Sequence, residues 1–199
     1  MEVAIVEYNA GNIRSVENAL RRLAVEPVLT HEAERLFAAD CVLFPGQGEA
    51  GTTMASLRAH GLDKVIPSLR QPVLGICVGM QLLCRHSEED DVDCLGVFDV
   101  PVVRFRPQSG GEKVPQMGWN SLLQVQGPLL EGLGKEPYVY FVHSYYVPQC
   151  PWTAATTDYV QPYSSALQRE NFFATQFHPE KSGAVGEQIL RNFLDLARG

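Results

Sequence analysis

Residues 73–83 read V-L-G-I-C-V-G-M-Q-L-L, and this stretch decides the fold that we expect for the whole chain. An apolar run leads into Cys77 and helix-forming residues follow Gly79, so the pattern predicts a buried strand, a sharp turn and a helix. A residue at the tip of such a turn has a strained backbone, and Gly75 and Gly79 relieve the crowding around it. The N–H groups and the dipole of the helix N-terminus stabilise a thiolate there. Cys77 is therefore a candidate nucleophile; a buried, inert cysteine is the alternative.

The composition is that of an ordinary globular chain. With 199 residues, 45% of them hydrophobic and 20% charged, the chain can build a sizeable core, and we expect one domain over residues 1–199. A net charge of −7 argues against a nucleic-acid surface. No apolar run approaches the ~20 residues of a membrane span, and the N-terminal M-E-V-A-I-V-E-Y is typical of a first strand rather than a signal peptide.

The five cysteines indicate a reducing environment. Their number is odd and no pair has C-x-x-C spacing, so we expect neither a disulfide framework nor a zinc site. Residues 87–93 carry consecutive carboxylates without a turn glycine, which does not match a calcium loop and predicts a solvated loop. We therefore expect a cytoplasmic protein with no metal and no cofactor.

Strands and helices alternate along the first part of the chain. Apolar patterns predict strands at 2–8, 25–29, 41–44 and 73–77, separated by helices at 12–23, 32–38 and 52–69. The second part is richer in strands, which we expect at 100–105, 120–125, 138–142, 153–157, 165–168 and 172–176, before a closing helix at 184–197. The sequence thus predicts a three-layer α/β fold, with a mostly parallel central sheet, helices on both faces and an antiparallel extension of the same sheet.

A base and its orienting group follow the last predicted strand, which ends in His178-Pro179-Glu180. Pro179 favours extended backbone at His178, and residues two apart on extended backbone point to the same side. Glu180 is then placed to accept a hydrogen bond from His178 and to fix its tautomer. Because sites of open α/β sheets lie at the carboxyl ends of strands, Cys77 and His178 are expected to meet as a cysteine–histidine–carboxylate triad.

Backbone N–H groups that hold an oxyanion have two candidate sources. One is Val78, the residue after the nucleophile, and the other is the loop Gly46-Gln47-Gly48 at the end of the third predicted strand. The same loop is a weak match to a phosphate-binding loop, because it lacks the required order and has no lysine nearby.

Together, G-I-C-V-G-M-Q, P-G-Q-G and H-P-E-K resemble the triad-type (class I) glutamine amidotransferases. The segments P-Q-M-G-W-N at 115–120, F-V-H-S-Y-Y at 141–146 and E-Y-N-A-G-N-I-R-S-V at 7–16 narrow the resemblance to the glutaminase subunits of imidazole glycerol phosphate synthase. The match runs from end to end with the motifs in family order. It implies the flavodoxin-like fold of that family.

The resemblance also implies the chemistry. Cys77 would form a thioester with glutamine, His178 would protonate the departing ammonia, and Glu180 would orient His178. Binding of the amino-acid end of glutamine would fall to Gln81, Ser144 and Tyr145.

In the resembling family the ammonia passes to a cyclase partner with a (βα)₈ barrel, so the resemblance implies a heterodimer. Residues at the partner interface or the ammonia exit would be Asn12, Met117, Trp119, Asn120 and Lys181. A core position for Trp119 and a plain surface position for Lys181 are the alternatives.

Two departures from the family pattern stand out. Gln47 replaces a residue that is usually apolar, and Glu7, Asn9 and Ala10 stand where an aspartate and a glycine are common. Two other functions stay open from the sequence. One is a glutaminase of another pathway, such as anthranilate or aminodeoxychorismate synthesis. The other is a cysteine-elbow stress protein without glutaminase activity, which usually lacks the late H-P-E.

Overall fold

A seven-stranded sheet forms the centre of the computed structural model, which describes residues 1–8, 13–108 and 111–198. Its strand order is β11-β12-β13-β4-β3-β1-β2. The strands are β1 (Val3–Val6), β2 (Val28–Thr30), β3 (Cys41–Gly46), β4 (Val73–Cys77), β11 (Thr153–Asp158), β12 (Pro162–Arg169) and β13 (Phe172–Thr175). Neighbours from β2 to β13 are parallel, whereas β12 and β11 continue the sheet in antiparallel pairs. The predicted mixed sheet is confirmed.

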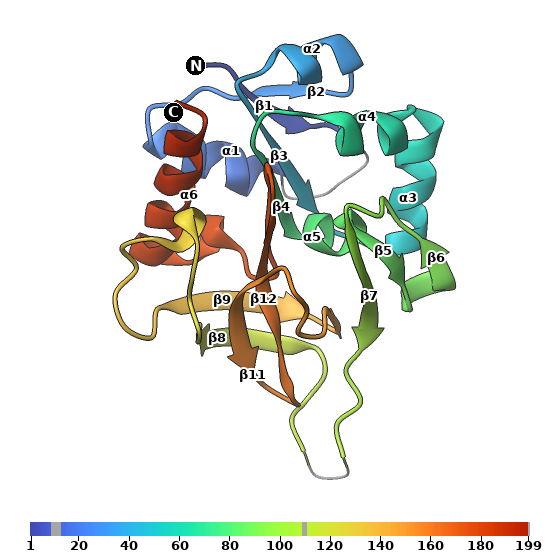
Figure 1. The fold of residues 1–199 in the computed structure, drawn as a ribbon, viewed down its shortest axis with the longest axis vertical. Helices are drawn as coiled ribbons and strands as arrows, with labels where there is room; N and C mark the ends of the chain where they lie inside the picture. The colour runs from blue at the N-terminus through green and yellow to red at the C-terminus, as the bar shows by residue number, and fades with distance from the viewer. Residues whose placement is uncertain (9–12, 109–110, 199) are drawn as a thin grey trace.

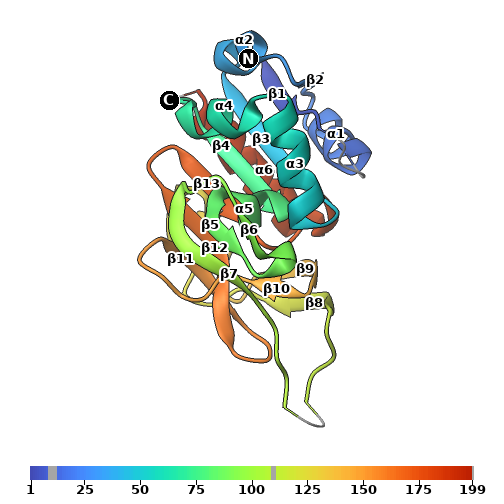
Figure 2. The ribbon, with the colours of Figure 1, turned by 90° about the vertical axis from the view of Figure 1, so that its right-hand side faces the viewer.

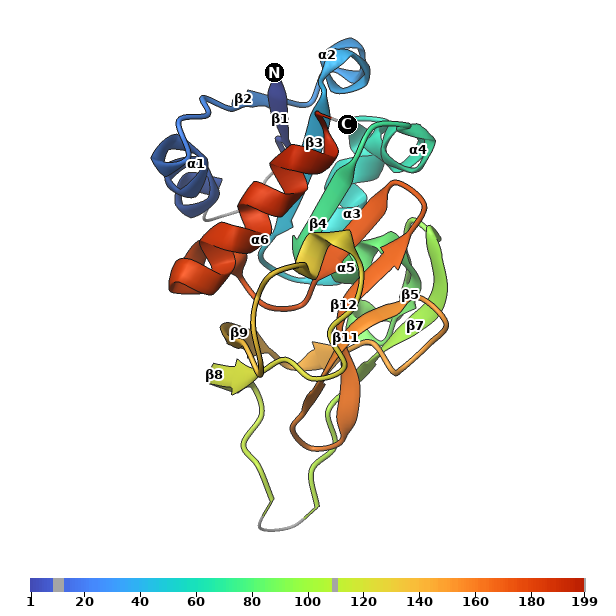
Figure 3. The ribbon, with the colours of Figure 1, turned by 60° about the vertical axis from the view of Figure 1, so that its left-hand side comes forward.

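Helices cover both faces of this sheet. They are α1 (Ile13–Arg22), α2 (Ala33–Ala38), α3 (Ala50–Ala59), α4 (Leu62–Ser68), α5 (Val78–Leu83) and α6 (Gly183–Leu196). Figure 1 shows the chain from the N-terminal β1 to the C-terminal α6. Figures 2 and 3 show α3 on one face and α6 on the other. In α1, Val16 and Leu20 are buried at helical spacing, as the pattern predicted. The three-layer arrangement is thus confirmed.

Not all the later strands join the central sheet, and in this respect the sequence-based prediction was wrong. A four-stranded sheet has the order β10-β7-β5-β6, and β8 pairs only with β9. These strands are β5 (Cys84–Ser87), β6 (Val92–Asp93), β7 (Phe98–Arg104), β8 (Gln116–Ser121), β9 (Tyr138–His143) and β10 (Tyr145–Tyr146). Both edges of β4 are already occupied, by β3 and β13, so the strand that follows α5 cannot pair with β4.

The sequence predicted a solvated loop for the acidic stretch at residues 87–93, and this prediction was wrong in part. The stretch contains a 3₁₀ turn, η1 (Glu89–Asp91). Glu89 and Asp90 accept hydrogen bonds of 2.9 Å from the backbone nitrogens of Ala50 and Gly51. Carboxylates are stabilised by the free N–H groups of a helix N-terminus, so these residues cap α3. The other 3₁₀ turns are η2 (Pro128–Leu130) and η3 (Pro179–Lys181).

Within the residues that the structure describes, no helix is long and apolar enough to cross a membrane. The five cysteines are free thiols. The same described residues contain no group of three or more histidine, cysteine, aspartate or glutamate side chains arranged to hold a metal ion.

Candidate active site

Cys77 occupies the turn between β4 and α5. Its backbone has φ 56° and ψ −110°, a conformation that costs energy for a residue other than glycine. Gly79 makes the turn possible, because a Cβ there would lie 1.8 Å from the carbonyl oxygen of Phe44. Cys77 is only 5% exposed, although it borders a cavity. The predicted elbow is confirmed, with the thiol at the N-terminus of a helix.

His178 lies just beyond β13, the strand that pairs with β4. Its backbone is extended, and its Nδ1 lies 2.8 Å from Oε1 of Glu180. Both side chains are almost completely buried, at 3% and 2% exposure. Backbone bonds fix the residue, because its N–H donates to the Tyr140 carbonyl at 3.0 Å and its own carbonyl accepts from Ser182 at 2.7 Å.

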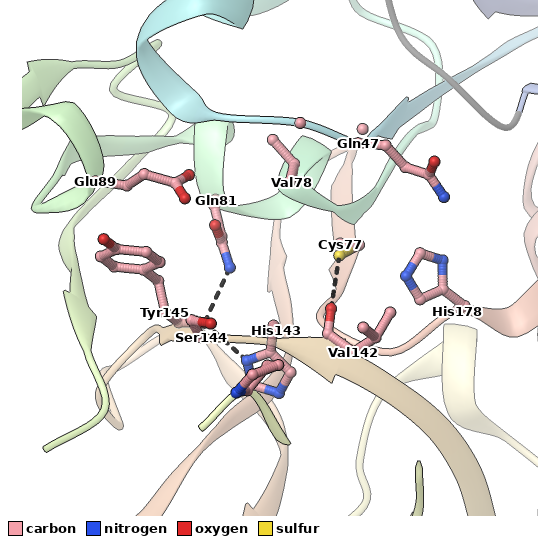
Figure 4. Close-up of a pocket in the computed structure, with 13 residues that line it drawn as sticks. Gln47, Cys77, Val78, Gln81, Glu89, Val142, His143, Ser144, Tyr145 and His178 are labelled. Atoms are coloured by element: carbon pink, nitrogen blue, oxygen red, sulfur yellow. Dashed lines mark hydrogen bonds between the residues drawn. The ribbon is translucent and has the colours of Figure 1, made fainter. Parts of the chain in front are cut away.

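The imidazole of His178 is turned toward Cys77, with a ring nitrogen facing the thiol (Figure 4). Nε2 is buried without a hydrogen-bond partner among the described residues. Burial alone would lower the pKa of His178, but negative charge at Cys77 and the bond to Glu180 outweigh it and raise the pKa to about 10. The imidazole of His178 is therefore held in its protonated form beside Cys77.

A cavity of about 440 Å³ opens over this pair. Apart from Glu180, which lies behind His178, every predicted catalytic, oxyanion-hole and glutamine-binding residue lines it: Cys77, His178, Val78, Gly46, Gln47, Gly48, Gln81, Ser144 and Tyr145. The parallel pairing of β3 with β4 sets Gly46 directly beside Cys77. A Cβ on Gly46 would lie 2.5 Å from the backbone nitrogen of Gly79, so only glycine fits.

Hydrogen bonds hold the far wall of the cavity. The Nε2 of Gln81 donates to the carbonyl of Tyr145 at 3.0 Å, and Nδ1 of His143 lies 2.7 Å from the same oxygen (Figure 4). Burial lowers the pKa of His143 to about 4, so its ring is neutral and its Nδ1–H is the donor. Both donors therefore fix the Tyr145 carbonyl.

Two residues of the site, Glu89 and Gln176, were not predicted from the sequence. Glu89 lines the cavity from η1, and burial raises the pKa of its carboxyl group. Because Glu89 stands in a run of acidic residues, the sequence predicted that it is exposed and gave no sign that it lines the cavity. Gln176 is completely buried and contacts both Gln81 and Cys77. Its spacing of two residues before His178 was the available signal.

The residues expected at a partner interface differ in their exposure to solvent. Met117 and Trp119 are 66% and 51% exposed on β8, so a core position for Trp119 is wrong. Asn120 is partly buried and its amide donates to the carbonyl of Asp158 at 3.0 Å. Lys181 ends η3 and is partly exposed. Asn12 lies outside the described residues.

The family model described as "Glutamine amidotransferase class-I" matches residues 4–197. The chain therefore belongs to the class-I glutamine amidotransferases, in agreement with its fold. A solved structure titled "Crystal structure of glutamine amidotransferase" has the same fold, with a TM-score of 0.75, 22% identity and 99% coverage of both chains.

Relatives with higher sequence identity define the family more narrowly. The imidazole glycerol phosphate synthase subunit HisH of Bacteroides thetaiotaomicron is 63% identical over 98% of this chain and 100% of its own length. The subunit of the same name from Salmonella typhimurium is 43% identical, with the same coverage of both chains. The chain belongs to this family of HisH subunits, and the resemblance seen in its motifs is confirmed.

Proposed function

We propose that the chain hydrolyses L-glutamine at Cys77 and supplies the ammonia as the glutaminase subunit of imidazole glycerol phosphate synthase, in histidine biosynthesis. The observation that carries the proposal is one constellation. Cys77 at a strained elbow and His178, held by Glu180 at 2.8 Å, border the same cavity of about 440 Å³. That volume is in the range of small-molecule sites.

The first half-reaction forms a thioester. The Cys77 thiolate attacks the carboxamide carbon, and the carbonyl electrons move to oxygen. His178 donates its proton to the nitrogen, the electrons on oxygen re-form the carbonyl as the C–N bond breaks, and ammonia leaves the thioester. In the second half-reaction His178 takes a proton from water, the hydroxide attacks the thioester, and the C–S bond breaks to return the thiolate and release glutamate. Glu180 keeps the proton of His178 on Nδ1 when the ring is neutral.

The developing oxyanion needs N–H donors. We assign this role to the backbone of Val78, at the N-terminus of α5, and to the loop Gly46-Gln47-Gly48. Both border the cavity next to Cys77.

The amino-acid end of glutamine requires partners for an ammonium and a carboxylate. Glu89 supplies a negative charge on the cavity wall, suited to the ammonium. Gln81 commits Nε2 to Tyr145 and Gln176, so its oxygen remains as an acceptor. Ser144 and Tyr145 complete the wall opposite the elbow.

We further propose that the ammonia passes to a cyclase partner with a (βα)₈ barrel in a heterodimer. The exposed side chains of Met117 and Trp119 on β8 offer an apolar contact surface. Asn120 and Lys181 would lie at its margin. The residues 1–199 would act as one domain in the cytoplasm, without a cofactor.

The sequence identity of 63% and 43% with HisH subunits, over 98% of this chain, favours this function. A glutaminase of another pathway and an inactive cysteine-elbow protein are the less favoured alternatives. The test uses the complete chain with its cyclase partner. Cys77→Ala should abolish glutamine-dependent product formation while ammonia-dependent formation continues. Cys94→Ala, outside the cavity, is the matched control and should retain both. Glutamine-dependent synthesis by Cys77→Ala would refute the proposal.

A further inference from the structure

Gln176 joins the nucleophile to the substrate-binding wall. Its side chain is completely buried between the triad and Gln81. Its Oε1 accepts a hydrogen bond of 3.0 Å from Nε2 of Gln81, and its own Nε2 lies 3.8 Å from Sγ of Cys77. Its backbone N–H is anchored on the carbonyl of Ser165 at 2.9 Å. The contact spans 99 residues of sequence and exists because β13 pairs with β4.

The polarity of this connection is fixed from one end. The Tyr145 carbonyl can only accept, so Gln81 must turn its NH₂ group toward it. The second N–H of Gln81 then needs an acceptor, and Gln176 meets it with its oxygen. The NH₂ group of Gln176 is therefore directed at Cys77.

Two polar groups lie near Sγ of Cys77, and they have opposite effects on a thiolate. The Val142 carbonyl, 3.8 Å from Sγ, can accept from the protonated thiol but repels a thiolate. Gln176 can only help the thiolate at this atom, because its NH₂ group is a donor. A hydrogen bond to the charged form of a group favours that form. The N–H of Gln176 and the imidazole of His178 (Figure 4) are therefore both placed next to Cys77, where a positive charge or a donor favours the thiolate.

We propose that Gln176 is a further catalytic residue, whose Nε2–H donates to the Cys77 thiolate before attack and again when the thiolate leaves the thioester. Its oxygen at the same time sets the orientation of Gln81. Only the step at the thioester rests on the proposed glutaminase function. The stabilisation of the thiolate in the free protein stands independently of it.

The test is the rate of alkylation of Cys77 by iodoacetamide as a function of pH, read by mass spectrometry of the Cys77 peptide in the complete chain. Gln176→Met and Gln176→Leu remove the donor and put an apolar side chain of similar size in its place. Gln168→Met is the matched control, on β12 and away from the cavity. His178 and Tyr8, which interact electrostatically with Cys77, are unchanged in these variants. The titratable side chains of Glu89 and His143, which line the same cavity, are unchanged as well.

Loss of one hydrogen bond to a charged group should move the midpoint of the alkylation profile up by about one pH unit, which means a roughly tenfold lower thiolate fraction at pH values well below the midpoint. The control should match the wild type. Glutaminase kcat should fall with the thiolate fraction. Profiles of both Gln176 variants that coincide with the wild type, with circular dichroism showing a folded chain, would overturn the proposal. If the wild-type chain with its partner has no glutaminase activity but the profiles of the Gln176 variants are shifted, the donor role is supported and the proposed function is refuted.

Discussion

Nδ1 of His178 lies 2.8 Å from Oε1 of Glu180, and the two side chains are sealed from solvent by the protein around them. This pair sets both the direction of the imidazole and its charge. Glu180→Gln keeps the shape and an acceptor oxygen but removes the negative charge. We expect kcat for glutamine hydrolysis to fall by up to about 10⁴, the loss seen when the orienting carboxylate of a serine-protease triad is replaced by an amide.

The charge effect has a defined sign. Glu180 contributes to raising the pKa of His178 to about 10, so its replacement should lower the pH at which the ring loses its proton. The His178 ring protons, followed by NMR in both proteins, report this directly. An unchanged titration together with an unchanged kcat would show that Glu180 has no part in orienting or charging the ring.

Gly79 should be the least replaceable glycine of the elbow. In Gly79→Ala the new Cβ meets the Phe44 carbonyl at 1.8 Å, and backbone must move to make room. We expect a loss of about 3 kcal/mol or more in the free energy of unfolding, as for severe overpacking.

Gly61→Ala is the comparison for Gly79→Ala. Gly61 has φ 69° and open space around its Cβ position, so only conformational strain of about 1 kcal/mol is expected. Urea unfolding of the two variants gives the ranking. Equal losses would contradict the close approach of α5 to β3.

His143 should make the stability of the chain depend on pH. Burial lowers its pKa to about 4, whereas in the unfolded chain the value is about 6.5. Between these values the unfolded state binds more protons, so stability is lost as the pH falls through this window. His143 alone should lower the free energy of unfolding by about 3 kcal/mol as the pH falls through this window.

In His143→Asn, an amide can still donate to the Tyr145 carbonyl but does not titrate. The free energy of unfolding, measured from pH 7 to pH 4, should decrease less in this variant than in the wild type. Parallel curves would mean that His143 titrates alike in both states.

The sequence sufficed for the parts of the site that local geometry determines. The elbow around Cys77 follows from a strand, a turn and a helix within eleven contiguous residues. The His178–Glu180 contact was also predicted, and the expected extended backbone at His178 before Pro179 is present. Glu180 itself, however, lies in the 3₁₀ turn η3 and not on the extended backbone from which its direction was predicted.

Features that depend on pairing between distant strands were not predictable in this way. The bond from Gln176 to Cys77 requires β13 to be the neighbour of β4, and the separate sheet of β5 and β7 follows from the occupied edges of β4. Glu89 was missed for a related reason. Its burial against α3 and the cavity comes from tertiary packing, while its sequence neighbours are those of an exposed loop.

Detection of the thioester is the most direct test of Cys77 as the nucleophile. The complete chain is mixed with glutamine and its partner, quenched in acid within the first turnover, and analysed by mass spectrometry. We expect a glutamyl group on the peptide that contains Cys77, and none on that peptide in Cys77→Ala. Glutamine hydrolysis at full rate with no adduct on Cys77, or with the adduct on another residue, would contradict the mechanism.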